Sequence, residues 1–255
     1  YKALTTDGKT RHNFGRISKD GNYIYYTSNK RDKNWFDVYR MEISSGKEEM
    51  ILQSDASNFI AAISDDGSKI IISRSSVRFS LDNDLYLVDA KDKKEIHLTP
   101  HDDAAQFGNV NFLDNNTILF ATNKDREFYN LSKMDLASKK IQILNNAKWD
   151  TDSTIVSHDG TMFASTNNRE GFSELFFTET KNAALKATPI QLPAQGSVGG
   201  LEFSRDNSQL AFTFSGAKNN GDIWVYNLWS RKLTQVTKSS RSGIPQNSFV
   251  EPKLI

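Results

Sequence analysis

Short apolar stretches separated by polar turns recur along the chain from about residue 12. In the first group, Tyr23–Thr27 is rich in aromatic and β-branched residues, and the Asp and Gly before it are typical of a tight turn. The stretch that begins at Asp37 alternates with a period of two, and Gly46 marks a second turn. This order predicts four antiparallel strands near residues 13–18, 23–27, 37–41 and 49–52.

The same four-strand pattern recurs five times. A turn motif of Ser, a variable residue, Asp and then Gly or Asn follows each first strand, with a degenerate third copy. Its first residues lie 46, 49, 44 and 47 positions apart, at Ser18, Ser64, Leu113, Ser157 and Ser204. An acidic or amide residue before an aliphatic one recurs in step, at Asp37, Asp84, Asn130, Glu174 and Asp222. A period in the mid-forties is the length of one four-stranded propeller blade.

We therefore predict an all-β protein, a β-propeller with five complete four-stranded blades and one orphan outer strand, as part of a ring of seven or eight blades. Ala3-Leu4-Thr5 resembles the end of an outer strand, and no segment has the periodicity of a three-turn helix. The predicted divisions are 1–12 for the outer strand of a preceding blade, 13–58, 59–107, 108–152, 153–199 and 200–238 for the blades, and 239–255 for a linker.

Composition narrows the possible partners. The 32 Lys and Arg residues balance 31 Asp and Glu residues, so the chain lacks the strong field that would attract nucleic acid or an anionic membrane surface. There is no apolar run long enough to span a membrane. The absence of cysteine suits the cytoplasm and the periplasm equally. We expect a soluble protein, with no nucleic acid and no membrane among its partners.

Catalytic motifs are missing from the sequence. An α/β-hydrolase nucleophile needs the pattern Gly-x-Ser-x-Gly, whereas Gly171-Phe172-Ser173 continues into Glu174-Leu175 at the start of a predicted third strand. There is no phosphate-binding glycine loop, and no histidine lies near a repeated carboxylate in a metal-like spacing. We predict no catalytic residue, cofactor or metal site; the histidines considered are His12, His97, His101 and His158.

The loops between the second and third strands combine arginine with aromatic residues. Such loops lie on one face of a propeller, where they could form a ring that binds carboxylates and apolar side chains. The alternative is that they are solvated charges with aromatic anchors. The candidate substrate-binding residues are Arg169 and Glu170, which could contact a peptide terminus, together with Arg31, Trp35 and Arg126. We expect the repeated carboxylates to be structural, accepting backbone N–H groups where each loop enters the third strand.

Two stretches carry a family resemblance: Phe203–Phe212 with Asp222–Tyr226, and Ser242–Pro245 with Phe249–Pro252. They resemble the N-terminal propeller of the prolyl oligopeptidase family of serine peptidases, in particular its acylaminoacyl-peptidase and dipeptidyl-peptidase-like branches. The resemblance implies a propeller that covers an α/β-hydrolase active site and admits only short peptides. It also implies that the catalytic triad lies outside these 255 residues.

Three functions are compatible with the sequence. The first is a non-catalytic domain that gates and selects short peptides for an α/β-hydrolase domain. The second is a stand-alone propeller similar to TolB, acting as a protein-binding module. The third is a propeller enzyme such as a glycosidase or lactonase, which the lack of a non-repeated cluster of acids and histidines disfavours.

Overall fold

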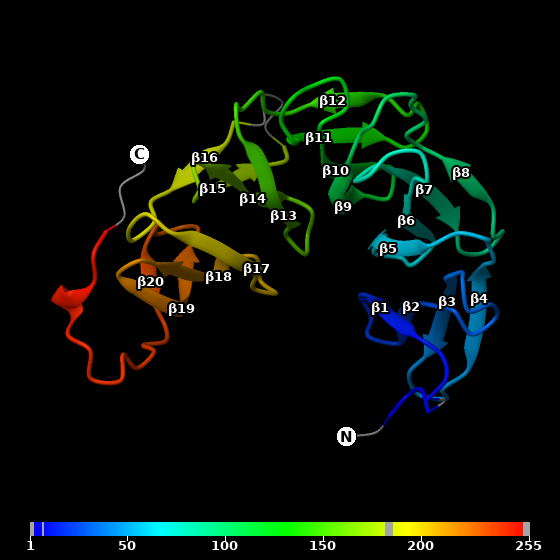
Figure 1. Ribbon diagram of the computed structural model, residues 1–255, viewed down its shortest axis with the longest axis horizontal. Coiled ribbons are helices and arrows are strands. Elements are labelled where there is room, and N and C mark those ends of the chain that lie inside the picture. Colours follow the sequence, from blue (N-terminus) through cyan, green and yellow to red (C-terminus); the bar gives the residue numbers. More distant parts are fainter. Residues whose placement is uncertain (1–2, 7, 182–185, 252–255) are drawn as a thin grey trace. The chain divides into compact units, whose positions relative to one another are not determined.

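The computed structural model describes residues 3–6, 8–181 and 186–251, and it contains five antiparallel sheets of four strands each (Figure 1). In every sheet the strands follow one another in chain order. Apart from these strands, the described residues form one 3-10 helix, Gln246–Ser248. The prediction of an all-β protein with five four-stranded blades is confirmed.

The chain divides into two compact units, residues 1–143 and 144–255. The first unit holds three blades. Blade 1 consists of β1 (His12–Ile17), β2 (Tyr23–Ser28), β3 (Asp37–Glu42) and β4 (Glu48–Leu52). Blade 2 consists of β5 (Asn58–Ile63), β6 (Lys69–Ser75), β7 (Asn83–Asp89) and β8 (Glu95–His97). Blade 3 consists of β9 (Phe107–Asp114), β10 (Thr117–Thr122), β11 (Asn130–Asp135) and β12 (Ile141–Ile143).

The second unit holds two blades. Blade 4 consists of β13 (Asp150–Val156), β14 (Met162–Arg169), β15 (Phe172–Glu179) and β16 (Thr188–Ile190). Blade 5 consists of β17 (Ser197–Phe203), β18 (Gln209–Gly216), β19 (Asn219–Asn227) and β20 (Leu233–Gln235). In all five blades the pairing of the first two strands contains a register shift, which bends and twists the sheet locally.

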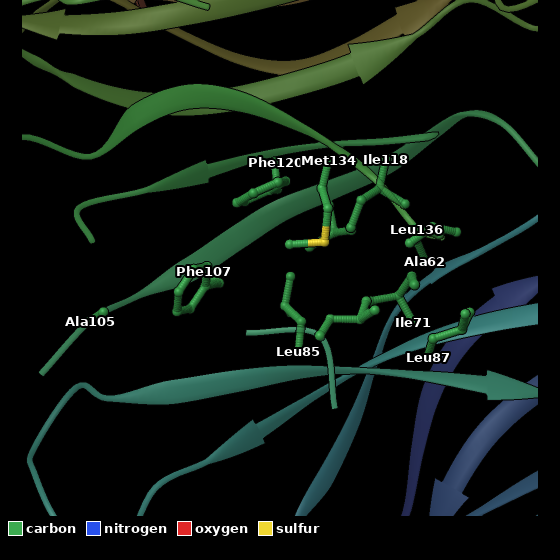
Figure 2. Packing of buried hydrophobic residues seen from close by; sticks show 12 residues of the cluster. Ala62, Ile71, Leu85, Leu87, Ala105, Phe107, Ile118, Phe120, Met134 and Leu136 are labelled. Atoms are coloured by element: carbon green, nitrogen blue, oxygen red, sulfur yellow. The ribbon is translucent and has the colours of Figure 1, made fainter. Parts of the chain in front are cut away.

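Neighbouring blades within a unit pack face to face through apolar side chains. Between blades 2 and 3, Figure 2 shows Leu85 and Ile71 near Met134 and Phe120, and all four are fully buried. Each such side chain contributes about 1.5–3 kcal/mol by leaving water. A similar cluster in the second unit joins Ala164, Leu175 and Phe177 of blade 4 to Leu210, Phe212, Phe214 and Tyr226 of blade 5.

Two of the repeated carboxylates connect the third strand to the chain that leaves the blade. Asp37 Oδ1 accepts the Ser54 amide at 3.0 Å, and Asp222 Oδ1 accepts the Ser239 amide at 2.8 Å. A structural role was predicted, and these bonds agree with it. The donors differ from the expectation, however, because they follow the fourth strand and do not lie where the loop enters the third.

Among the described residues, those before β1 and those after β20 form no strand. We expected an outer strand in 1–12, but residues 3–6 and 8–11 form none, since an isolated extended segment has no neighbouring strand to pair with. Tyr1, Lys2 and Asp7 of that range, and Pro252–Ile255 of the predicted linker, lie outside the described residues. Within the part that the structure describes, no helix has the length and hydrophobicity needed to cross a bilayer.

Candidate functional site

The hairpin between β14 and β15 is tight and rigid. Arg169 pairs with Phe172, so the turn consists of Glu170 and Gly171 alone. Their φ angles are 53° and 85°, as a type I′ turn requires at both central positions. The Gly171 amide also donates to Asn168 Oδ1 at 3.0 Å. The hairpin therefore holds Arg169 and Glu170 on a fixed backbone at the edge of blade 4.

The charged groups of this hairpin are accessible. Arg169 Nη1 lies 3.1 Å from Glu174 Oε1, and the Arg169 side chain is 58% exposed. Glu170 is exposed at the tip. An exposed ion pair of this kind contributes little to stability, so Arg169 can exchange its partner for an incoming anionic group at small cost.

A cavity of about 270 Å³ lies beside the hairpin, within the second unit. Phe172 supplies its aromatic wall. Gln195, Ser197 and Ser215 line it with an amide and two hydroxyls, and none of these three side chains is hydrogen-bonded to another described residue. The complete lining is Gly171, Phe172, Gln195, Gly196, Ser197, Ser215, Gly216 and Ala217.

Two glycines allow the backbones around this cavity to approach closely. A Cβ on Gly196 would lie 2.3 Å from the Ser215 carbonyl oxygen, and one on Gly216 would lie 2.6 Å from the Gln195 carbonyl oxygen. No other residue fits at either position without backbone movement. The cavity thus offers an aromatic ring, uncharged polar groups and exposed backbone, which suits a short neutral part of a peptide.

The other predicted site residues belong to the first unit, and the two arginines among them have partners in their own blades. Arg31 donates to the buried carboxylate of Asp37 at 2.7 Å and lies 2.9 Å from Asp55. Arg126 Nη1 donates to Asn130 Oδ1 at 2.7 Å. Trp35 is 36% exposed. Because Arg169 and Glu170 lie in the second unit, the ring of loop side chains stays a prediction.

Sequence reasoning missed a cluster of ionisable groups in blade 2. His101 Nε2 lies 2.8 Å from Asp82 Oδ1, and its Nδ1 donates to the Thr99 carbonyl at 2.6 Å. His97 Nε2 lies 2.7 Å from Asp84 Oδ1, and His101 Nδ1 lies 3.2 Å from the same oxygen. Their spacing along the sequence did not reveal these pairs, because His97–Asp84 and His101–Asp82 are 13 and 19 residues apart and meet only when β8 pairs with β7.

The electrostatics of this cluster favour an ion pair. Burial opposes ionisation of Asp82, but bonds from the Ala105 amide, His101 and Ser76 outweigh it and lower its pKa to about 2. Burial also opposes protonation of His101, yet the bond to Asp82 and the Thr99 carbonyl raise its pKa above the ordinary value. No group of three or more His, Asp or Glu side chains in the described residues is placed to bind a metal.

Ser173, the serine of the incomplete nucleophile motif, has a structural role. It lies in β15, as predicted, and its hydroxyl accepts the Val198 amide at 3.0 Å. This bond joins blade 4 to the first strand of blade 5.

Comparison with known proteins identifies the family. The model of the prolyl oligopeptidase N-terminal β-propeller domain matches residues 17–239. The match covers most of the 255 residues, so the chain belongs to this family. The predicted family is thereby confirmed. A search among curated proteins finds no match.

Solved structures share the fold at low sequence identity. Prolyl oligopeptidase B from Galerina marginata is 13% identical with a TM-score of 0.71, and the match covers 91% of this chain and 34% of that one. A prolyl endopeptidase is 12% identical with a TM-score of 0.62, covering 91% and 42%. A putative TolB from Agrobacterium tumefaciens is 16% identical with a TM-score of 0.65, covering 88% and 80%. This chain thus spans less than half the length of the two peptidases.

Proposed function

We propose that this chain is the non-catalytic propeller domain of a serine peptidase and selects short peptides for an α/β-hydrolase domain outside these 255 residues. The family match over residues 17–239 carries the proposal. The two similar peptidases are more than twice as long as the region they share with this chain, which leaves room for a catalytic domain.

The peptide would bind at the cavity beside the β14–β15 hairpin. Arg169 would bind a peptide carboxylate and Glu170 a peptide ammonium group, because each is accessible and held on a rigid turn. The cavity would take an adjoining neutral residue against Phe172, with the two serine hydroxyls facing the peptide backbone. The propeller would therefore act by restricting and orienting peptides, and the bond-breaking groups would come from the hydrolase domain.

A TolB-like binding module is the second candidate. The observation in its favour is that this chain covers 80% of the putative TolB structure. The two candidates differ in what the encoding gene specifies after position 255. A nucleophile elbow there supports the peptidase, whereas a stop codon or an unrelated domain would contradict it.

Two substitutions in the full-length protein test the peptide site. Arg169→Ala removes a charge-assisted hydrogen bond, and Ala217→Trp fills the cavity. Each is expected to raise KM for short peptides by about tenfold with kcat nearly unchanged, since both remove ground-state binding. Steady-state kinetics on a series of short peptides would measure this.

The matched control is Arg205→Ala. Arg205 is also an exposed arginine of the second unit, but it lies in the β17–β18 turn, away from the cavity. We expect it to leave kcat/KM unchanged. If Arg169→Ala and Ala217→Trp behave like this control, the hairpin and cavity are not the substrate site.

A further inference from the structure

The loop between β6 and β7 exposes three large apolar side chains. In this segment, which comprises residues 76–82 and is called the blade 2 loop below, Val77 is fully exposed, Leu81 is 79% exposed and Phe79 is 45% exposed. No other stretch of five residues in the described ranges has three exposed large hydrophobic side chains. Scattered single cases are normal in proteins, but a cluster of this kind indicates an interaction surface.

The base of the blade 2 loop is held firmly. The Ser76 amide donates to the Asp82 carbonyl at 2.9 Å, and the Arg78 amide donates to Ser76 Oγ at 3.0 Å. Asp82 Oδ1 accepts from His101 and also from the Ala105 amide at 3.0 Å. Arg78 Nη2 donates to the His101 carbonyl at 2.9 Å. These hydrogen bonds hold both ends of the loop in place, and the exposed apolar side chains lie between them.

The backbone of the tip also points to an interaction. Leu81 has a φ of 60°, in the left-handed region that a leucine seldom adopts. The fold holds this leucine in an unfavourable conformation and leaves most of its side chain in water. A partner that buries Leu81 would offset both costs.

The corresponding loops of the other blades lack this property. Phe128 and Tyr129 in blade 3 are half-buried, and blade 4 has only the Glu170–Gly171 turn. Blade 1 exposes Trp35 to 36% without further large apolar side chains beside it. The apolar tip is therefore a feature of blade 2 and is not required by the blade fold.

We propose that the blade 2 loop docks on an apolar surface of the hydrolase domain of the same protein, an inference that rests on the function proposed above. The similar peptidases have more than half of their length outside the region shared with this chain, so they provide a large second body for such a contact. The loop has one exposed charge, Arg78. Charge complementarity would place an acidic group at the rim of the partner surface. A prearranged loop loses little conformational entropy on docking.

The test uses the full-length protein and a triple substitution, Val77→Thr with Phe79→Ser and Leu81→Asn. Asparagine tolerates the left-handed backbone, and all three side chains are exposed, so the thermal midpoint of the propeller should not fall. We expect proteolysis between the domains to accelerate at least tenfold, and the amides of the loop to exchange hydrogen at least tenfold faster. Trp229→Ser is the control, because Trp229 is 80% exposed on the β19–β20 hairpin of blade 5 and is not part of the proposed contact.

The outcomes separate the two proposals. Unchanged proteolysis and exchange in a protein that does contain a hydrolase domain would overturn the docking and leave the proposed function standing. A full-length protein without such a domain would overturn both. A triple variant that changes only from dimer to monomer in sedimentation would show that the loop binds a second copy, and this would also overturn the proposal.

Discussion

The two ends of each blade are built on different principles. At one end lies the turn between the first and second strands, where the same hydrogen bonds recur. In blade 2, Ser64 Oγ donates to Asp66 Oδ1 at 2.7 Å and accepts the Lys69 amide at 3.0 Å, while Asp66 accepts the Ser68 amide at 3.0 Å. Equivalent bonds hold the turns that begin at Ser18, Ser157 and Ser204.

This turn end also joins neighbouring blades. Lys19 Nζ lies 2.5 Å from Asp65, linking blades 1 and 2. Asn115 Nδ2 donates to Asp66 Oδ2 at 2.7 Å, linking blades 2 and 3. In the second unit, the His158 amide donates to Asn207 Oδ1 at 2.8 Å, linking blades 4 and 5. Within each unit, these turns therefore contact one another from blade to blade.

At the other end, the loops between the second and third strands differ from blade to blade in the partners that their arginines bind. The arginine of blade 1 binds two carboxylates, that of blade 2 binds a backbone carbonyl, and that of blade 4 forms an exposed ion pair. This difference indicates that the turn end has a structural role that the blades share. The loop end is free to vary, and both proposed binding surfaces lie there.

The largest expected effect comes from the loop end. Asp82→Asn would remove the carboxylate at Nε2 of the buried His101 and leave only Asp84 near its Nδ1, so we expect the free energy of unfolding to fall by about 3 kcal/mol. Urea denaturation measures this directly. The control is Asp103→Asn, an exposed position in the same region, which should change stability by less than about 0.5 kcal/mol. A loss below about 1 kcal/mol for Asp82→Asn would show that the ion pair does not hold the loop.

The pH dependence of stability provides a second comparison of the two ends. Asp66 and Asp82 both have a pKa of about 2, so the stability they contribute is present above about pH 3.9 and is lost as the pH falls toward 2. The pKa of His101 is raised, so its contribution is complete below about pH 6.5 and is lost as the pH rises through the raised value. Urea denaturation across this range should show a maximum between about pH 4 and 6.5.

Replacing His101 isolates the alkaline side of that profile. His101→Gln should remove the decline above about pH 6.5 and keep the acid decline, whereas His158→Gln should keep both. A wild-type decline that persists in His101→Gln would assign it to another group.

The contrast between the ends also explains what the sequence could predict. Ser64 and Asp66 are two residues apart, so their turn is a local property that can be read from the chain, and it located all five blades. His101 and Asp82 are 19 residues apart, and the cavity joins Gly171 to Gly216 across two blades. Such partners become neighbours only when the sheets form, so the sequence indicated which loops carry candidate residues but not which arginines are already paired.

The smallest expected effects compare two adjacent aspartates at the turn end. Asp66 accepts hydrogen bonds from Ser64, Ser68 and Asn115, and the Ser64 hydroxyl is the main cause of its low pKa, about 2. Among the residues that the structure describes, the Asp65 carboxylate pairs only with Lys19, in an exposed ion pair. Asp66→Ala should therefore cost about 1–2 kcal/mol in urea denaturation and Asp65→Ala less than about 1 kcal/mol. Asp206 accepts the corresponding hydrogen bonds from Ser204 and Ser208 in blade 5, so Asp206→Ala should also exceed Asp65→Ala in cost. Equal losses at Asp65 and Asp66 would mean that exposed charge pairing between blades, and not the turn itself, stabilises this end.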